Sequence, residues 1–125
     1  ELEAAAREAQ EAHTEESAKA GLIEEYLNRL LPEDWAKKDI GERRRFIHGS
    51  DFGETDEGTV QRDKVCAMEV WVELFEGDPK QMNPMQAREI NDILRRLPGW
   101  TEYTKNRGRL YFGKNYGRQR AFVRA

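Results

Sequence analysis

Ten side chains within residues 86–125 have the chemistry needed to bind a nucleic acid. Guanidinium and ammonium groups neutralise phosphates, and arginine and asparagine can also read base edges through paired hydrogen bonds. These candidates are Arg88, Asn91, Arg95, Arg96, Lys105, Arg107, Arg109, Lys114, Arg118 and Arg120. We expect the first four to meet duplex DNA from a helix over residues 83–97, and the others from a basic hairpin over residues 100–124. Most contacts should go to phosphates, which position a protein without reading sequence.

The uneven distribution of charge supports this expectation. Residues 1–30 and residues 31–85 each carry a net charge of −5, whereas residues 86–125 contain ten basic and three acidic side chains, a net charge of +7. A basic surface attracts polyanions. The same charge could instead offset the acidic part of the molecule and keep the protein in solution. Aromatic residues interleaved with the basic ones favour the nucleic-acid interpretation.

Residues suited to catalysis or metal binding form no recognisable pattern. His13 and His48 are far apart in sequence, and neither lies beside Cys66, which we expect to be an inert buried side chain. The acidic loop over residues 50–58 lacks the ligand spacing of an EF-hand, and the sequence has no zinc-ligand spacing. The P-loop motif is also missing from the sequence. We therefore expect no catalytic residue, no metal and no cofactor in this chain.

The helix that would carry the first candidates has clear signals at both ends. Asn83 suits the N-cap, Pro84 the first helical position, and Gln86 the return half of a capping box. Pro98-Gly99 ends the helix. The apolar stripe that should face the core comprises Ile90, Ile93, Leu94 and Leu97. The opposite side carries the arginines, but Asp92 lies in its middle and should weaken contact with DNA there.

The remaining candidates lie in segments that alternate as strands do. Residues 100–105 and 109–112 predict two strands joined by a hairpin turn at residues 106–108, and residues 119–123 predict a third. Their buried face should contain Trp100, Leu110, Phe112 and Phe122. The basic side chains would then occupy edges and loops.

Two helices are predicted before the arginine-bearing one, over residues 40–47 and 63–75. The second is enclosed by apolar side chains, and a short link joins it to the helix at residues 83–97. This order, followed by a basic hairpin, predicts a winged helix-turn-helix, a mainly α fold of the α+β class. The polar sides that should face solvent contain Arg43, Arg44 and Arg45 on the first helix and Glu69, Glu73 and Glu76 on the second.

The first 31 residues predict an acidic helical lead-in to a domain over residues 32–125. They are rich in alanine and glutamate, which favour helix, and Gly21 marks a bend or break. The face that should pack on the domain comprises Leu22, Ile23, Tyr26, Leu27, Leu30 and Leu31. Because the chain begins with Glu1, we expect a piece of a longer protein, whose lead-in connects to an upstream domain or pairs with a second copy in a homo-oligomer.

Several fragments along the chain are similar to one protein family. They are LPEDW at 31–35, ERRRF at 42–46, RDKVCAMEVW at 62–71, REINDIL at 88–94 and YGRQRAF at 116–122. Together they resemble the C-terminal region of virulence-associated E proteins, large phage and mobile-element proteins with a P-loop ATPase region like that of primase-helicases. The resemblance implies a bacterial or phage origin, a role in DNA replication, and an ATPase domain upstream in the same chain. It implies no catalytic residue within these 125 residues. The single cysteine, Cys66, fits the reducing cytoplasm of a bacterial or phage-infected host.

Two other interpretations stay open. Single-stranded nucleic acid could stack on Tyr103, Tyr111 and Tyr116, although these rings could instead fill the hairpin core. Alternatively, the chain could be a protein-interaction or oligomerisation module whose basic face meets an acidic protein surface. We expect no membrane partner, since no apolar run approaches the roughly 20 residues that a membrane-spanning helix needs.

Overall fold

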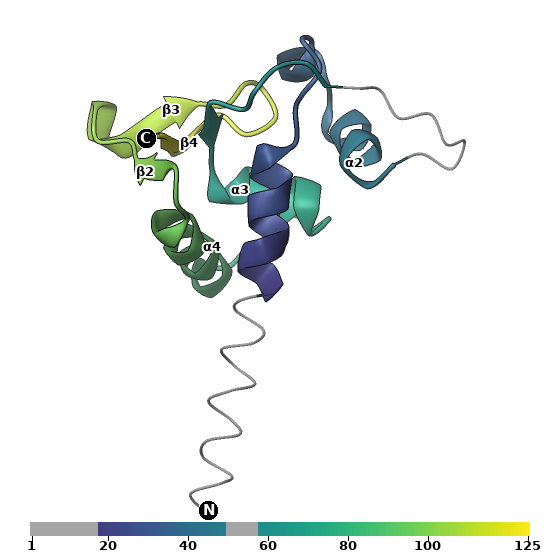
Figure 1. Cartoon of the computed structure of the whole chain (residues 1–125). Coiled ribbons are helices and arrows are strands. Elements are labelled where there is room, and N and C mark those ends of the chain that lie inside the picture. Colours follow the sequence, from purple (N-terminus) through teal and green to yellow (C-terminus); the bar gives the residue numbers. More distant parts are fainter. Residues whose placement is uncertain (1–17, 50–57) are drawn as a thin grey trace, which may run out of the picture.

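The computed structural model describes residues 18–49 and 58–125, in which helices predominate before Gly99 and short antiparallel strands after it (Figure 1). A helix over residues 18–28 comes first. It is followed by η1 (Trp35–Lys37), α2 (Ile40–His48), β1 (Lys64–Val65), α3 (Ala67–Glu69), the π-helix η2 (Val70–Leu74), η3 (Pro79–Gln81), α4 (Pro84–Arg96), β2 (Trp100–Glu102), η4 (Asn106–Gly108), β3 (Arg109–Tyr111), β4 (Arg118–Arg120) and β5 (Phe122–Arg124). This is the α+β class predicted from the sequence. None of the described helices is both long and apolar enough to span a lipid bilayer.

The strands form two small antiparallel sheets. Three strands pair in the order β1-β5-β2, while β3 and β4 form a separate pair. Only Ala121 separates β4 from β5, so residues 118–124 leave one sheet and enter the other almost without a break. The Ala121 N–H donates to the Gly108 carbonyl and its carbonyl accepts from Tyr103 N–H, which ties the two sheets together.

The predicted strand pairing was wrong. We expected residues 100–105 to pair with residues 109–112, but β2 pairs with β5, and β3 pairs with β4 across the loop at residues 112–117. The cause lies at Asn106, Arg107 and Gly108, whose φ values are 49°, 60° and 78°. A type I′ hairpin turn has two left-handed residues, whereas three in succession here form a longer left-handed turn that carries the chain into a second sheet.

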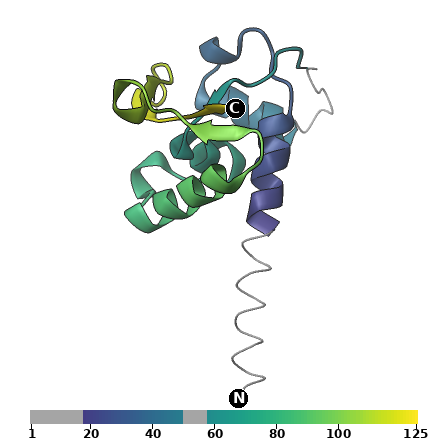
Figure 2. The same ribbon diagram turned by 60° about the vertical axis from the view of Figure 1, so that its left-hand side comes forward.

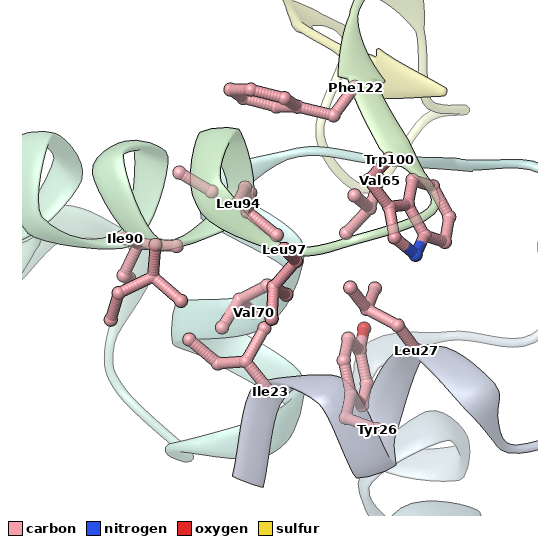
Figure 3. Close-up of a cluster of buried hydrophobic side chains, with 12 residues drawn as sticks. Ile23, Tyr26, Leu27, Val65, Val70, Ile90, Leu94, Leu97, Trp100 and Phe122 are labelled. Atoms are coloured by element: carbon pink, nitrogen blue, oxygen red, sulfur yellow. The ribbon is translucent and has the colours of Figure 1, made fainter. Parts of the chain in front are cut away.

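One hydrophobic cluster joins the helices to the three-stranded sheet (Figure 3). In both overall views the helix over residues 18–28 and α4 lie on the same side of β2 (Figures 1 and 2). The predicted capping box of α4 is confirmed at Asn83 and Gln86, and the whole predicted apolar stripe is buried. The cluster comprises Ile23, Tyr26, Leu27, Val65, Ala67, Val70, Ile90, Ile93, Leu94, Leu97, Trp100 and Phe122.

The helix over residues 18–28 differs from its prediction in two respects. Gly21 lies inside the helix rather than at a break. Leu22 and Leu30 are 49% and 47% exposed instead of packing on the domain. Ile23 and Leu27 are one helical turn apart and share the buried face, which leaves Leu22 at its edge, while Leu30 follows the end of the helix. The predicted lead-in helix before residue 18, with His13, lies outside the described residues.

The helix predicted over residues 63–75 begins later than expected. Lys64–Val65 forms β1, with Val65 opposite Phe122, so helical structure starts only at Ala67. The last turns widen into a π-helix, in which Phe75 N–H donates to the Val70 carbonyl at 3.2 Å. The β-branched Val65 is therefore used as a strand residue, a preference that the helical period of its neighbours concealed.

A pair of leucine substitutions in the first helix tests this packing. Leu27 is 1% exposed and Leu22 is 49% exposed, although they lie five positions apart. We expect Leu27→Ala to lower the free energy of unfolding by about 2–5 kcal/mol because it leaves a cavity in the core. Leu22→Ala should change it by less than about 0.5 kcal/mol, since a surface substitution removes little packing. Urea denaturation measures both, and equal losses would contradict this placement of the helix.

Candidate nucleic-acid interface

Four arginines gather on one face of the β3–β4 hairpin and its preceding turn. In the antiparallel register Arg109 lies opposite Arg120, and Tyr111 lies opposite Arg118. Side chains alternate along a strand, so the two opposed pairs are exposed on one face, while Leu110 and Gln119 are half-buried on the other. The fourth arginine, Arg107, is exposed in the turn before β3. A surface cavity of about 560 Å³ lies over this face. We call it the arginine groove, and it is lined by Asn106, Arg107, Arg109, Arg118 and Arg120.

The charges of the arginine groove are not balanced by the described part of the chain. Like charges directly opposite each other on paired strands destabilise a sheet, and Arg109 faces Arg120. Within residues 18–49 and 58–125, no carboxylate forms an ion pair with any of the four groove arginines. Arg107 also holds a left-handed φ of 60°, which non-glycine residues seldom adopt. The hairpin thus keeps an arrangement that its own stability does not favour.

The candidates on α4 are placed differently. Arg88 and Arg96 are exposed, but Arg95 binds Asp92 at 2.8 Å and also Glu102 of β2, so carboxylates of the same chain offset its charge. Asn91 is half-buried, and its Oδ1 is buried without a hydrogen-bond partner among the described residues. None of these side chains lines the arginine groove.

The other two predicted residues flank the groove in sequence without lining it. Lys105 is exposed just before the turn at η4, and Lys114 is exposed in the loop between β3 and β4. Of the ten predicted residues, the structure therefore brings together Arg107, Arg109, Arg118 and Arg120.

Of the tyrosines proposed as stacking platforms, only Tyr111 is well exposed, at 60%. Tyr116 is buried, and its hydroxyl donates to Glu73 Oε2 at 2.6 Å. Tyr103 is half-buried against a second hydrophobic cluster, and its hydroxyl accepts from Asn106 Nδ2 at 3.3 Å.

A buried charge network, which the sequence analysis missed, lies behind the hairpin. It centres on Glu73, whose side chain is fully buried. Its carboxylate accepts from Tyr26 at 2.7 Å, from Arg43 at 3.0 Å and from Tyr116 at 2.6 Å. These donors come from the helix over residues 18–28, from α2 and from the loop at residues 112–117. The complete network comprises Tyr26, Arg43, Arg62, Glu69, Glu73 and Tyr116.

The second half of the network pairs Glu69 with Arg62. Arg62 Nη1 donates to Glu69 Oε2 at 3.2 Å, and the guanidinium lies 4.3 Å from the centre of the Tyr26 ring. Burial raises the pKa of Glu69 to about 7, although the charge of Arg62 opposes this shift. Burial also raises the pKa of Tyr116, and the charge of Glu73 raises it further, so its hydroxyl remains a donor.

These contacts correct the predicted solvent faces. Arg43 is 4% exposed, and Arg44 is half-buried with hydrogen bonds to the carbonyls of Val72 and Gly77, so only Arg45 is exposed as expected. Glu69 and Glu73, predicted on a polar side, are buried. Arg43 lies three and four positions before Phe46 and Ile47, so on a helix it shares the inward face that those two residues were predicted to form. That geometry was a signal the sequence already contained.

Among the other described residues, Cys66 and His48 have side chains of a kind used in catalysis, and both have structural contacts. Cys66 is buried, and burial raises the pKa of its thiol, which keeps it protonated and unreactive. His48 ends α2, with its Nε2 2.8 Å from the Glu73 carbonyl. No group of His, Cys, Asp and Glu within residues 18–49 and 58–125 has an arrangement suited to holding a metal ion. The acidic loop at residues 50–57 lies outside the described part.

No protein-family model matches this chain, and no curated protein matches it either. The similarity to virulence-associated E proteins therefore stays a prediction from sequence fragments.

The network predicts a large effect of removing one charge. Glu73→Gln leaves two buried guanidinium groups with a single carboxylate, so we expect the free energy of unfolding to fall by about 3–5 kcal/mol. Glu76→Gln is the matched control, because Glu76 lies close by in sequence but its side chain is 57% exposed. It should change stability by less than about 0.5 kcal/mol. A similar effect of the two substitutions in urea denaturation would show that Glu73 is not central.

The raised pKa of Glu69 predicts how the stability of the protein depends on pH. Its pKa rises from 4.5 in the unfolded chain to about 7 in the folded protein, so the folded state binds the proton more tightly. The stability that this proton contributes is complete below pH 4.5 and is lost as the pH rises to about 7.

The variant Glu69→Gln resembles the protonated carboxyl and lacks this dependence. Relative to the parent, it should therefore become steadily more stable as the pH rises across that range. Urea denaturation of both proteins at several pH values measures the difference. A difference that stays constant with pH would exclude a raised pKa at Glu69.

Proposed function

We propose that this protein is a non-catalytic nucleic-acid-binding module that holds duplex DNA in the arginine groove. The observation that carries the proposal is the set of four exposed arginines, two of them directly opposed, with no acidic partner among the described residues. A polyanion would offset the repulsion between Arg109 and Arg120. Phosphates are the fitting ligand, because each guanidinium presents donors matched to phosphate oxygens.

The order of elements supports a winged helix-turn-helix for this module. The helix over residues 18–28, β1, α3 with η2, α4, β2 and β5 follow one another, and the sheet order is β1-β5-β2. The β3–β4 hairpin emerges between β2 and β5, where a wing lies in such folds. In this arrangement α2 is an addition between the first helix and β1.

Within this proposal the hairpin contributes more than α4 to binding. Arg95 is paired with Asp92 and Glu102, and Asn91 is half-buried, so the helix offers fewer open donors than its sequence predicts. Exposed Arg88 on α4 and the flanking lysines, Lys105 and Lys114, would add phosphate contacts at the margins. Such contacts favour binding with little sequence preference.

The resemblance to virulence-associated E proteins suggests where in a longer protein this module would act. In such a protein the module would follow the ATPase domain of a phage-type replication helicase in the cytoplasm and would hold DNA near that domain. A self-association or protein-binding role through the first helix is the alternative. Under that alternative, replacing the groove arginines would not change the affinity for DNA.

Removing the groove charges tests the proposal. We expect the triple variant Arg109→Gln, Arg118→Gln and Arg120→Gln to weaken binding to a short labelled duplex by about 10- to 100-fold, since it removes three phosphate contacts. The control variant replaces exposed Lys37, Arg45 and Lys80 by Gln, which removes the same charge from elsewhere on the surface.

Fluorescence anisotropy at one fixed salt concentration compares the three proteins. The control variant should bind within about twofold of the parent, because salt screens exposed charges that do not contact the bound phosphates. Equal losses in the two variants would point to non-specific attraction. No loss in the groove variant would refute the proposed site.

A further inference from the structure

A second cavity, of about 420 Å³, lies between the buried charge network and the start of the loop that joins β3 to β4. We call it the Trp35 cavity. Its walls include the apolar side chains of Leu31, Trp35, Val60 and Phe112. The volume lies in the range of about 300–1,000 Å³ that is usual for small-molecule sites. Tyr111 lines this cavity too, and it is also the exposed aromatic residue on the arginine-bearing face of the hairpin.

Side chains that line this cavity have unmet hydrogen-bonding groups. Arg62 and Glu69 are 3% and 4% exposed, yet Nε of Arg62 and Oε1 of Glu69 have no hydrogen-bond partner among the described residues. Nη2 of Arg62 also lacks a hydrogen bond there, although it forms an ion pair with Glu73 Oε1 at 3.9 Å. Nε of Arg43 and Nε1 of Trp35 are also buried and unpartnered. Buried polar groups are normally paired, and an unmet one destabilises the protein, so this concentration of unmet groups points to a polar ligand.

The charges around the cavity restrict what that occupant is. Three cationic side chains, Arg43, Arg62 and Lys64, share the lining with three carboxylates, Glu33, Asp63 and Glu69. This formal balance offers no net attraction for a phosphate and favours a neutral group. Lys64 is also occupied, because its Nζ donates to the Tyr111 carbonyl at 2.8 Å.

The unmet groups define the edge that the occupant must present. Arg62 and Trp35 have unmet N–H donors, so a ligand with acceptors is favoured. Glu69 can pair with a donor or an acceptor of the ligand, because burial raises the pKa of its carboxyl to about 7. The apolar and aromatic walls require a flat, weakly polar body. A nucleobase combines a neutral aromatic body with an edge that carries donors and acceptors side by side.

We propose that the Trp35 cavity takes an unpaired nucleobase from a strand whose phosphates lie in the arginine groove. This inference rests on the proposed nucleic-acid binding. Tyr111 connects the two sites, because it lines the cavity and lies opposite Arg118 of the groove. The preferred ligand is then a junction between duplex and single-stranded DNA rather than a blunt duplex.

The experiment compares three labelled DNAs with the same duplex. One is blunt, one has a short single-stranded overhang, and one has an overhang of equal length made of abasic nucleotides. We expect the overhang to tighten binding by about tenfold, as a stacked base contributes about 1–3 kcal/mol. The abasic overhang keeps the phosphates but lacks the bases, so it should bind like the blunt duplex.

Filling the cavity provides the matched test in the protein. Val60 is 44% exposed and lines the cavity, so Val60→Trp should block it without disturbing the core, as should Ala36→Phe at a second exposed position of the lining. The control is Met85→Trp, which adds the same side chain at a residue that is 76% exposed and outside the cavity.

Both blocking variants should lose the tenfold preference for the overhang and keep the affinity for blunt duplex, which also shows that they are folded. Met85→Trp should keep the preference. The inference is overturned if the parent shows no preference, if the abasic overhang binds as well as the normal one, or if the blocking variants keep the preference. A protein that binds none of the DNAs would refute the proposed function itself.

Discussion

The fully buried carboxylate of Glu73 is the constraint on which the rest of the structure depends. Burying a carboxylate without partners is strongly unfavourable, so folding has to bring its donors to it. Those donors, Tyr26, Arg43 and Tyr116, are 47, 30 and 43 residues away in sequence. One side chain thus fixes where the first helix, α2 and the loop of the β3–β4 hairpin meet. Arg62 and Glu69 extend the same network toward β1 and balance its charge.

This anchoring also explains how the hairpin can carry uncompensated charge. Its loop is held in the protein by the buried Phe112 and by the Tyr116 hydroxyl, and Lys64 binds the Tyr111 carbonyl. The opposite face is then free to expose arginines that repel one another. Inside the protein the formal charges of two arginines and two glutamates balance, whereas the arginine groove has no such balance within the described residues. That contrast is the physical basis for proposing an external polyanion.

Local signals predicted some elements well and could not predict others. The ends and buried face of α4 followed from Asn83, Gln86 and a regular apolar stripe, because capping and amphipathicity depend on nearby residues. The groove arginines were all named in advance, since exposed basic residues in alternating segments are visible in sequence. Their convergence, however, depends on the pairing of β3 with β4, whereas we predicted that residues 109–112 pair with residues 100–105.

The wrong predictions about charged side chains share one physical cause. Whether a charged side chain faces solvent depends on which partners the fold provides, and those partners lie far away in the chain. Arg43 and Glu73 each resemble part of a solvated face in their own helix, yet together they form a buried ion pair at 3.0 Å. Arg95 was predicted to contact DNA, but its charge is offset by Glu102, which lies in a strand that follows the helix.

The salt dependence of duplex binding by the parent protein tests the central claim most directly. Each phosphate neutralised by the groove arginines contributes about −0.9 to the slope of log affinity against log salt. If the four arginines each meet a phosphate, the slope should be about −3 to −4. A slope near zero, or no measurable binding at low salt, would contradict the proposal that the arginine groove is a nucleic-acid interface.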